Sequence, residues 1–267
     1  MFLARLLVLF SLVCISCAHS SFEQKQLKHA LDFATSNRLE LEILLQHYTY
    51  DSLKLEAAKF LIRNMPHCYS YQQGGEMDSV KRVRTYYSPF GQIDQTYARR
   101  WGHYTYRNLL KIYDAHIITA EYLIDNIDRA FDNWQKRPWN RSLSFEDFCE
   151  YLLPYRIGDE PLEEWRELYE KKYGYLLDSI YKGGDVVEAA NLVSRHLQEP
   201  VFIYCEDFEL PHIGPRYLFS HRYGSCVDAA DIVTYAFRAV GIPCMEDTDA
   251  RGGHVWNVVR DTTGRDV

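Results

Sequence analysis

A cysteine and a histidine near the end of the chain are the side chains best placed to do chemistry. Cys226 follows Tyr223-Gly224-Ser225 and begins a run with apolar residues at helical spacing, which stops at Gly241-Ile242-Pro243. His254 follows a double glycine and begins a β-branched and aromatic run that predicts a strand. A thiolate beside an imidazolium attacks carbonyl carbons, so the pair predicts acyl-transfer chemistry.

The predicted helix suggests how Cys226 would become a thiolate. A free thiol has a pKa of about 8.5, so its surroundings must favour the anion. On the first helical turn, unpaired backbone N–H groups and the helix dipole do so modestly, and a protonated His254 supplies more. Taken singly, either residue is more often structural than catalytic. The chemical interpretation therefore depends on the two occurring together.

Three motifs in this region resemble those of the transglutaminase-like superfamily, in the same order. They are Gly224-Ser225-Cys226, Arg238-Ala239-Val240-Gly241-Ile242-Pro243 and His254-Val255-Trp256. The resemblance directly covers residues 217–267, and the helical region before them is similar to that of secreted bacterial proteins with this domain. It implies an α+β fold, in which a helical N-terminal region precedes a papain-like core. In that core the helix bearing Cys226 packs on an antiparallel sheet bearing His254, and a Cys-His-Asp triad needs no cofactor.

The resemblance implies that the third residue is an aspartate on the strand after His254. Asp261 lies at an odd offset from His254, so its side chain should point to the opposite face of the strand. Asp266 lies beyond the Thr262-Thr263-Gly264 turn and is the candidate that this chain offers. The other interpretation is that the chain ends before the third residue and before the later strands. Residues 201–267 would then be an incomplete core.

The N-terminus predicts export from the cytoplasm. Arg5 precedes an apolar stretch from Leu6 to Ile15, which is too short to span a bilayer as a mature helix and is typical of a signal peptide. Cys14-Ile15-Ser16-Cys17 resembles a bacterial lipobox, which implies a signal peptide at residues 1–17, a lipid on Cys17 and a membrane-anchored lipoprotein in the cell envelope. Ordinary cleavage after Ala18 is the alternative.

Composition argues against other classes of function. The net charge is −7, and neither a basic run nor a glycine-rich phosphate loop occurs, so we expect no nucleic-acid partner. Cysteines beyond Cys14 and Cys17 are odd in number, widely spaced and without a Cys-x-x-Cys pair: Cys68, Cys149, Cys205, Cys226 and Cys244. The sequence therefore predicts neither a metal site nor a regular disulfide framework.

Hydrophobic periodicity divides the chain into a helical domain at residues 22–200 and the core at 201–267. Apolar residues at three-four spacing predict helices at residues 39–48, 53–65, 108–134, 162–173 and 186–197. Ser144-Phe145-Glu146-Asp147 resembles a helix-starting cap. Proline and glycine breaks separate these segments.

Together these features predict a secreted cysteine hydrolase acting on peptide or other amide bonds, or a transamidase if an amine rather than water accepts the acyl group. The predicted catalytic residues are Cys226 and His254, with Asp266 as the candidate third member. An alternative from another class is a catalytically inactive binding or scaffold module of the cell envelope that keeps the fold and the Cys-His pair.

Overall fold

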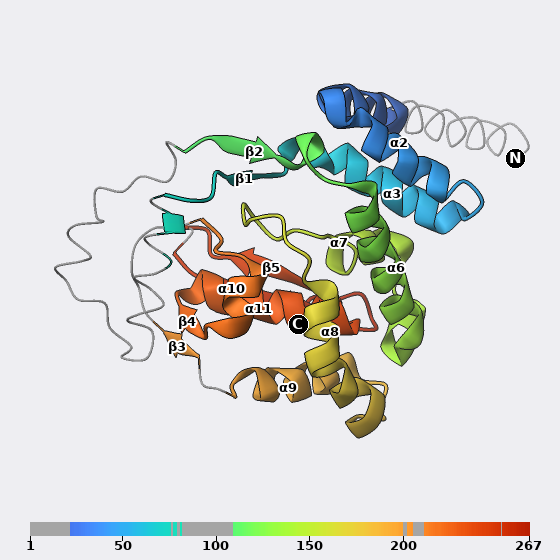
Figure 1. Ribbon diagram of the computed structural model, residues 1–267. Coiled ribbons are helices and arrows are strands. Elements are labelled where there is room, and N and C mark those ends of the chain that lie inside the picture. Colours follow the sequence, from blue (N-terminus) through green and yellow to red (C-terminus); the bar gives the residue numbers. More distant parts are fainter. Residues whose placement is uncertain are drawn as a thin grey trace, which may run out of the picture.

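The computed structural model describes residues 22–75, 77–78, 81, 109–199, 202–204, 211–251 and 253–267. Helices dominate this part of the chain, and its strands form two-stranded pairs (Figure 1). The predicted signal peptide and its lipidation site, Cys17, lie outside the described residues.

An N-terminal group of helices builds the first hydrophobic core. Residues 22–33 are helical, followed by α2 (Arg38–His47), α3 (Ser52–Asn64), α6 (Ala120–Lys136) and α7 (Phe145–Tyr151). Their apolar faces meet around fully buried Leu44, Ile62, Leu123, Ile127 and Phe148. Ser144 caps α7 by accepting the backbone N–H of Asp147 at 3.0 Å, as its sequence motif predicts.

The helix expected at residues 108–134 begins later than its periodicity predicted. Lys111–Tyr113 forms strand β2, which pairs antiparallel with β1 (Tyr69–Tyr71), and a 3₁₀ turn, η5 (Asp114–His116), follows. The α-helix starts at Ala120 because Thr119 caps it, accepting the Tyr122 N–H at 3.2 Å. The β-branched residues just before Ala120 also favour extended backbone. The region expected to be helical therefore contains a small sheet.

A second core surrounds α11 (Cys226–Val240). It is packed by α8 (Arg166–Tyr175), α9 (Val186–Leu197), β5 (Cys244–Thr248) and β6 (Val255–Val259), and Figure 1 shows α11 between α9 and the β5–β6 hairpin. The shorter η6 (Pro138–Ser142), η7 (Leu176–Ile180) and α10 (Pro215–Ser220) surround it, and β3 (Ile203–Tyr204) pairs in parallel with β4 (Tyr223–Gly224). Hydrophobic contacts therefore cross the expected boundary at residue 200, because α8 and α9 lie before that residue and pack on α11, which lies after it.

The turn after α11 decides how the hairpin lies on the helix. Gly241 takes a left-handed conformation, with φ of 82°, and ends α11. The chain then returns along the helix as β5, and β6 pairs antiparallel with it, from Cys244–Val259 to Thr248–Val255. The end of β5 and the start of β6 consequently lie towards the first turn of α11. A mixed helix-and-strand architecture, with α11 on an antiparallel hairpin, is confirmed.

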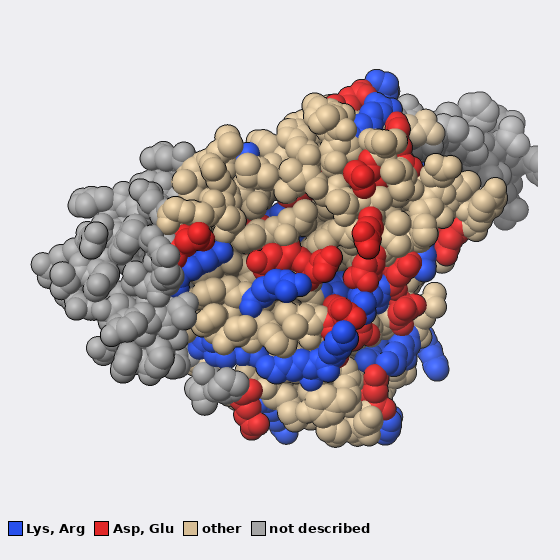
Figure 2. Space-filling view, viewed as in Figure 1, with Lys and Arg blue, Asp and Glu red and all other residues tan. Residues whose placement is uncertain are grey.

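Acidic and basic side chains lie side by side over α6 and α8 (Figure 2). Arg129 on α6 illustrates the pattern, since it bridges Asp125 at 2.8 Å, Glu170 at 3.1 Å and Glu167 at 3.3 Å. Within the described part of the chain, no helix combines the length and the apolar character needed to cross a membrane.

Candidate functional site

Cys226 is the first residue of α11, and a capping box sets the backbone in front of it. Ser225 is the N-cap, and its N–H donates to Asp228 Oδ2 at 2.8 Å. The side chain of Cys226 is half-buried. The first-turn N–H groups of α11, which have no partner within the helix, lie beside this position.

The other cysteines in the described ranges are poorer nucleophiles. Burial raises the pKa of Cys149 and of Cys244 to about 12, and that of Cys68 to about 11. Their thiolate fractions at neutral pH are therefore negligible. All of these described cysteines, including Cys226, are free thiols. Among them, the helix-terminal position distinguishes Cys226.

His254 lies immediately before β6, and its ring is exposed. Thr248 Oγ1 donates to the His254 carbonyl at 3.0 Å, and the Asp249 N–H donates to it at 3.1 Å, so the hairpin holds the backbone. Asn257 donates to the Ala230 carbonyl at 3.0 Å, which places the odd-numbered side chains of β6 on the α11 side. His254 has an even number and lies just before the strand, so it belongs to the set of residues whose side chains face away from α11. Nothing in the described structure links its ring to Cys226 by a hydrogen bond.

Asp266 lies at the opposite end of β6 from His254. It pairs with Arg260 through a β-bridge and a 3.1 Å ion pair, and Tyr151 donates to its carboxylate at 2.9 Å. At about 3.3 Å per residue, the strand separates His254 from Arg260 by about 20 Å. The turn that begins at Asp261 returns the chain to the end of β6, so Asp266 is not positioned to orient His254.

A buried ion pair that sequence reasoning missed lies beside α11. Asp231 is fully buried, and each of its carboxylate oxygens lies 2.9 Å from His212 Nδ1. Burial alone would lower the pKa of His212, but the charge and hydrogen bond of Asp231 outweigh it and raise that pKa to about 10. His212 is therefore an imidazolium at neutral pH. The sequence signal was an aspartate on the core-facing stripe of α11, where a carboxylate needs a partner.

Glu246 on β5 extends this pair into a cluster. Thr234 Oγ1 donates to Glu246 Oε1 at 3.0 Å and accepts from Asn257 Nδ2 at 2.8 Å. Burial, followed by the charge of nearby Asp231, raises the pKa of Glu246 to about 8. Glu246 is therefore mostly protonated at neutral pH.

A loop at residues 157–160 packs against the other side of His212. The backbone N–H of His212 donates to Asp159 Oδ1 at 2.9 Å. Glu160 shapes the loop by accepting the N–H groups of Ile157 and Gly158, both at 2.7 Å. A Cβ atom on Gly158 would lie 2.3 Å from the imidazole, so this position requires glycine while His212 stays in place.

Gly158→Ala is expected to separate His212 from Asp231, because the added methyl group occupies the space of the imidazole. Without its partner, the pKa of His212 is expected to fall from about 10 to below the ordinary value of about 6.5, since burial then dominates. An NMR titration of the His212 ring measures this change. Gly184→Ala is the control because a Cβ there meets open space. An unchanged His212 pKa would contradict the steric argument.

A pocket of about 410 Å³ lies between the buried cluster and the two motif residues. Its walls are formed by Ile157, His212, Val227, Arg238, Met245, Glu246, Asp247, Thr248 and Val255. Val227 is the neighbour of Cys226, and Val255 is the neighbour of His254. The structure therefore places a neighbour of each motif residue in the wall of one pocket, although no hydrogen bond links the side chains of Cys226 and His254 in the described part of the chain.

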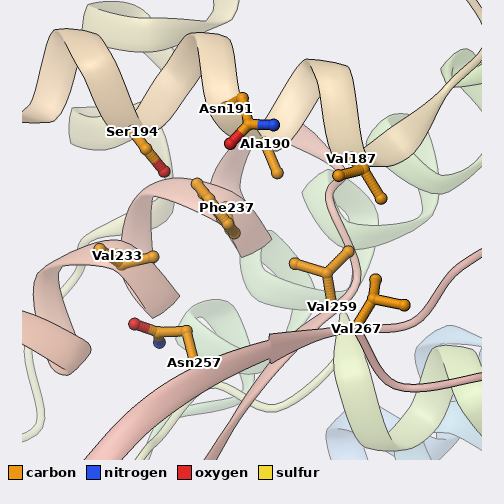
Figure 3. Close-up of a pocket in the computed structure, with 9 residues that line it drawn as sticks. All are labelled: Val187, Ala190, Asn191, Ser194, Val233, Phe237, Asn257, Val259 and Val267. Atoms are coloured by element: carbon orange, nitrogen blue, oxygen red, sulfur yellow. The ribbon is translucent and has the colours of Figure 1, made fainter.

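A second pocket, of about 360 Å³, lies further along α11. Figure 3 shows apolar side chains of α9, α11, β6 and the last residue converging on it, namely Val187, Ala190, Val233, Phe237, Val259 and Val267. Neither Cys226 nor His254 lines this second pocket, so it is separate from the candidate site.

The described residues contain no group of three or more histidine, cysteine or carboxylate side chains arranged to hold a metal ion. Comparison with known proteins gives no further assignment. No protein-family model, curated protein or solved structure matches the chain. The functional argument therefore comes from the site and from the resemblance of its motifs.

Proposed function

We propose that this chain is a secreted, lipid-anchored cysteine enzyme of the transglutaminase-like type that breaks peptide or other amide bonds. The observation that carries the proposal is the position of Cys226, half-buried at the start of a capped 15-residue helix. The approach of β5, β6 and the 410 Å³ pocket to the same end of that helix supports it. The motif resemblance supports the same chemistry.

The proposed reaction has two steps. The Cys226 thiolate attacks the amide carbonyl carbon, and the C–N bond breaks as the His254 imidazolium gives its proton to the leaving amine. A water molecule then attacks the resulting thioester, with neutral His254 accepting its proton. The C–S bond breaks, the acid product leaves, and the Cys226 thiolate and His254 imidazolium are regenerated. An amine in place of water would give transamidation. Hydrolysis is the favoured outcome because the related bacterial proteins often act as peptidases.

The reaction requires His254 to turn towards Cys226. His254 is exposed and precedes the regular strand, so its side chain has room to change rotamer. The backbone hydrogen bonds from Thr248 and Asp249 would keep it at the start of β6 during this change. A third residue that orients the imidazole is not identified among the described carboxylates.

The pH dependence of Cys226 alkylation tests the proposal. An assembled thiolate–imidazolium pair should give a midpoint well below the reference pKa of about 8.5. His254→Ala should move that midpoint up, and Cys226→Ser should abolish the labelled site. Mass spectrometry of iodoacetamide-treated protein measures both. Equal midpoints in the wild type and His254→Ala, near the reference value, would reject the pair.

A non-catalytic envelope module is the second candidate function. The lack of a hydrogen bond between Cys226 and His254 within the described residues favours it, as does the engagement of Asp266 by Arg260 and Tyr151. Slow alkylation that is unaffected by His254→Ala would favour this binding or scaffold function. A His254-dependent thiolate would favour the enzyme.

A further inference from the structure

One edge of β6 carries backbone groups without partners among the described residues. The Arg260 N–H donates to the Pro243 carbonyl at 3.1 Å, so the even-numbered residues along this strand direct their backbone groups towards β5. The odd-numbered residues direct theirs to the opposite edge. No hydrogen bond within the described structure reaches the backbone groups of Val255 and Asn257 on that edge. The edge is therefore open to pairing with another strand.

A further strand already begins on this edge. The Val259 N–H donates to the Val267 carbonyl at 2.9 Å, and the Val267 N–H donates to the Val259 carbonyl at 3.0 Å. A β-bridge joins Arg260 to Asp266 in the antiparallel sense. Any strand that extends this ladder is therefore antiparallel to β6 and runs from Val259 towards Val255.

The 360 Å³ pocket lies on the face of β6 where that strand would continue. Asn257 donates to the Ala230 carbonyl, so the odd-numbered side chains of β6 face α11. Opposite residues of an antiparallel pair share a face, and Val259 and Val267 both line this pocket. A residue paired with Asn257 consequently has its side chain on the pocket face. Figure 3 shows that α9 lies across the pocket from Asn257.

The walls of this pocket favour an apolar side chain. Val187 and Ala190 come from α9, and Val233 and Phe237 come from α11. None of the side chains that line the pocket in the described structure is charged. Its volume of about 360 Å³ is near the lower end of the range for ligand sites, about 300–1,000 Å³. A single apolar side chain therefore suits it better than a large organic ligand.

We propose that the open edge of β6 and the 360 Å³ pocket together bind an extended peptide by strand addition. The peptide pairs antiparallel with Asn257 and Val255 and places an apolar side chain in the pocket. Its backbone hydrogen bonds supply affinity, and the pocket supplies selectivity. Val255 also lines the 410 Å³ pocket, so the C-terminal part of the peptide runs towards the pocket beside Cys226. That delivery alone rests on the proposed function.

Fluorescence anisotropy of a labelled peptide tests the pairing. The probe is fluorescein-Lys-Thr-Val-Thr-Val-Thr-Lys-amide, and the protein carries Cys226→Ser so that it leaves the peptide intact. Antiparallel pairing turns the N–H groups of both valines towards β6 and that of the threonine between them away from it. N-methylation of the first valine should therefore weaken binding about tenfold, whereas N-methylation of the central threonine should weaken it less than about twofold.

Two tryptophan substitutions on α9 test the pocket. Ser194 lines the pocket, so Ser194→Trp should fill it and weaken binding of the unmodified peptide at least about tenfold. Arg195→Trp places the same side chain at the next, exposed position and should change the affinity less than about twofold.

Equal affinities for the two methylated peptides, or no binding of the unmodified one, would overturn the strand-addition site. This comparison uses an unchanged pocket, so it does not depend on the folding of Ser194→Trp. A dimer of the chain that excludes the peptide, detected by sedimentation, would also overturn the proposal and assign the edge to a second copy.

Cleavage assays with Cys226 intact separate this site from the proposed enzyme. Cleavage of the same peptide that Ser194→Trp slows and Arg195→Trp does not would support both. Binding without cleavage would support the peptide site and count against delivery to Cys226. Cleavage that Ser194→Trp leaves unchanged would support the enzyme and overturn the peptide site.

Discussion

Asp114→Ala is expected to lower the free energy of unfolding by about 3–5 kcal/mol. Asp114 is fully buried, and Arg156, with a side chain 5% exposed, donates to its two oxygens at 2.5 and 2.6 Å. Tyr155 donates to the same carboxylate at 3.0 Å. Removing Asp114 takes the acceptor from Nε and Nη2 of Arg156 and from the Tyr155 hydroxyl in a buried position, and leaves Glu160, 3.6 Å from Nη1, as the carboxylate beside the guanidinium. Urea denaturation measures the loss.

A surface pair provides the control for this prediction. Arg38 and Glu42 form a 2.7 Å ion pair, but their side chains are 42% and 48% exposed. Glu42→Ala should therefore cost less than about 1 kcal/mol. Replacing both Asp114 and Arg156 by leucine should recover only part of the loss, because the Arg156 charge leaves with Asp114 but buried Glu160 keeps only the Ile157 and Gly158 N–H groups as partners. A loss at Asp114 no greater than that at Glu42 would show that water solvates the broken pair.

Gly241→Ala is the second large effect, with an expected loss of about 2–5 kcal/mol. Gly241 has a φ of 82°, and a left-handed conformation costs a residue with a side chain about 1–2 kcal/mol. A Cβ would also lie 2.7 Å from the Asn133 carbonyl oxygen and 2.8 Å from Arg137 Cγ. Relieving such overpacking costs about 1–3 kcal/mol more. Urea denaturation measures the sum.

Gly264→Ala isolates the backbone contribution. Gly264 has a similar φ of 79°, but a Cβ there meets nothing within 4 Å. Its alanine variant should lose only the conformational part, about 1–2 kcal/mol. Equal losses at the two glycines would show that the contact with α6 yields easily. A larger loss at Gly241 would identify that glycine as a docking point between the two cores.

The Gly241 prediction also explains the motif at the end of α11. The Gly241 carbonyl accepts from Trp139 Nε1 and Asn140 Nδ2, both at 2.9 Å, and Arg137 Nε donates to the Val240 carbonyl at 2.7 Å. From the sequence, this glycine is predicted only to stop the helix. Its close approach to the chain between α6 and η6 is a further, tertiary reason for a glycine.

Local signals in the sequence were enough to locate several elements. The helix expected at residues 186–197 is α9, which Asp185 caps through the N–H groups of Val187 and Glu188. The helix that starts at Cys226 is α11, and the strand after His254 is β6. A cap, a glycine stop and an apolar period act over a few residues, so they can be recognised without knowledge of the fold. The expected helix at residues 108–134 was wrong in its first part, where pairing with distant β1 produces a strand.

The sequence by itself determined the position of Cys226 on a helix start and of His254 before a strand, because both depend on neighbouring residues. Only the tertiary structure decided which side chains meet. Within the described residues it gave His254 no hydrogen bond to Cys226, directed Asp266 to Arg260, and paired His212 with Asp231 near Glu246. The segment before α10, α11 and β5 supply this last cluster, and their approach is set by burial of the second core. Pairing of buried charges over such separations depends on packing, which no local sequence pattern records.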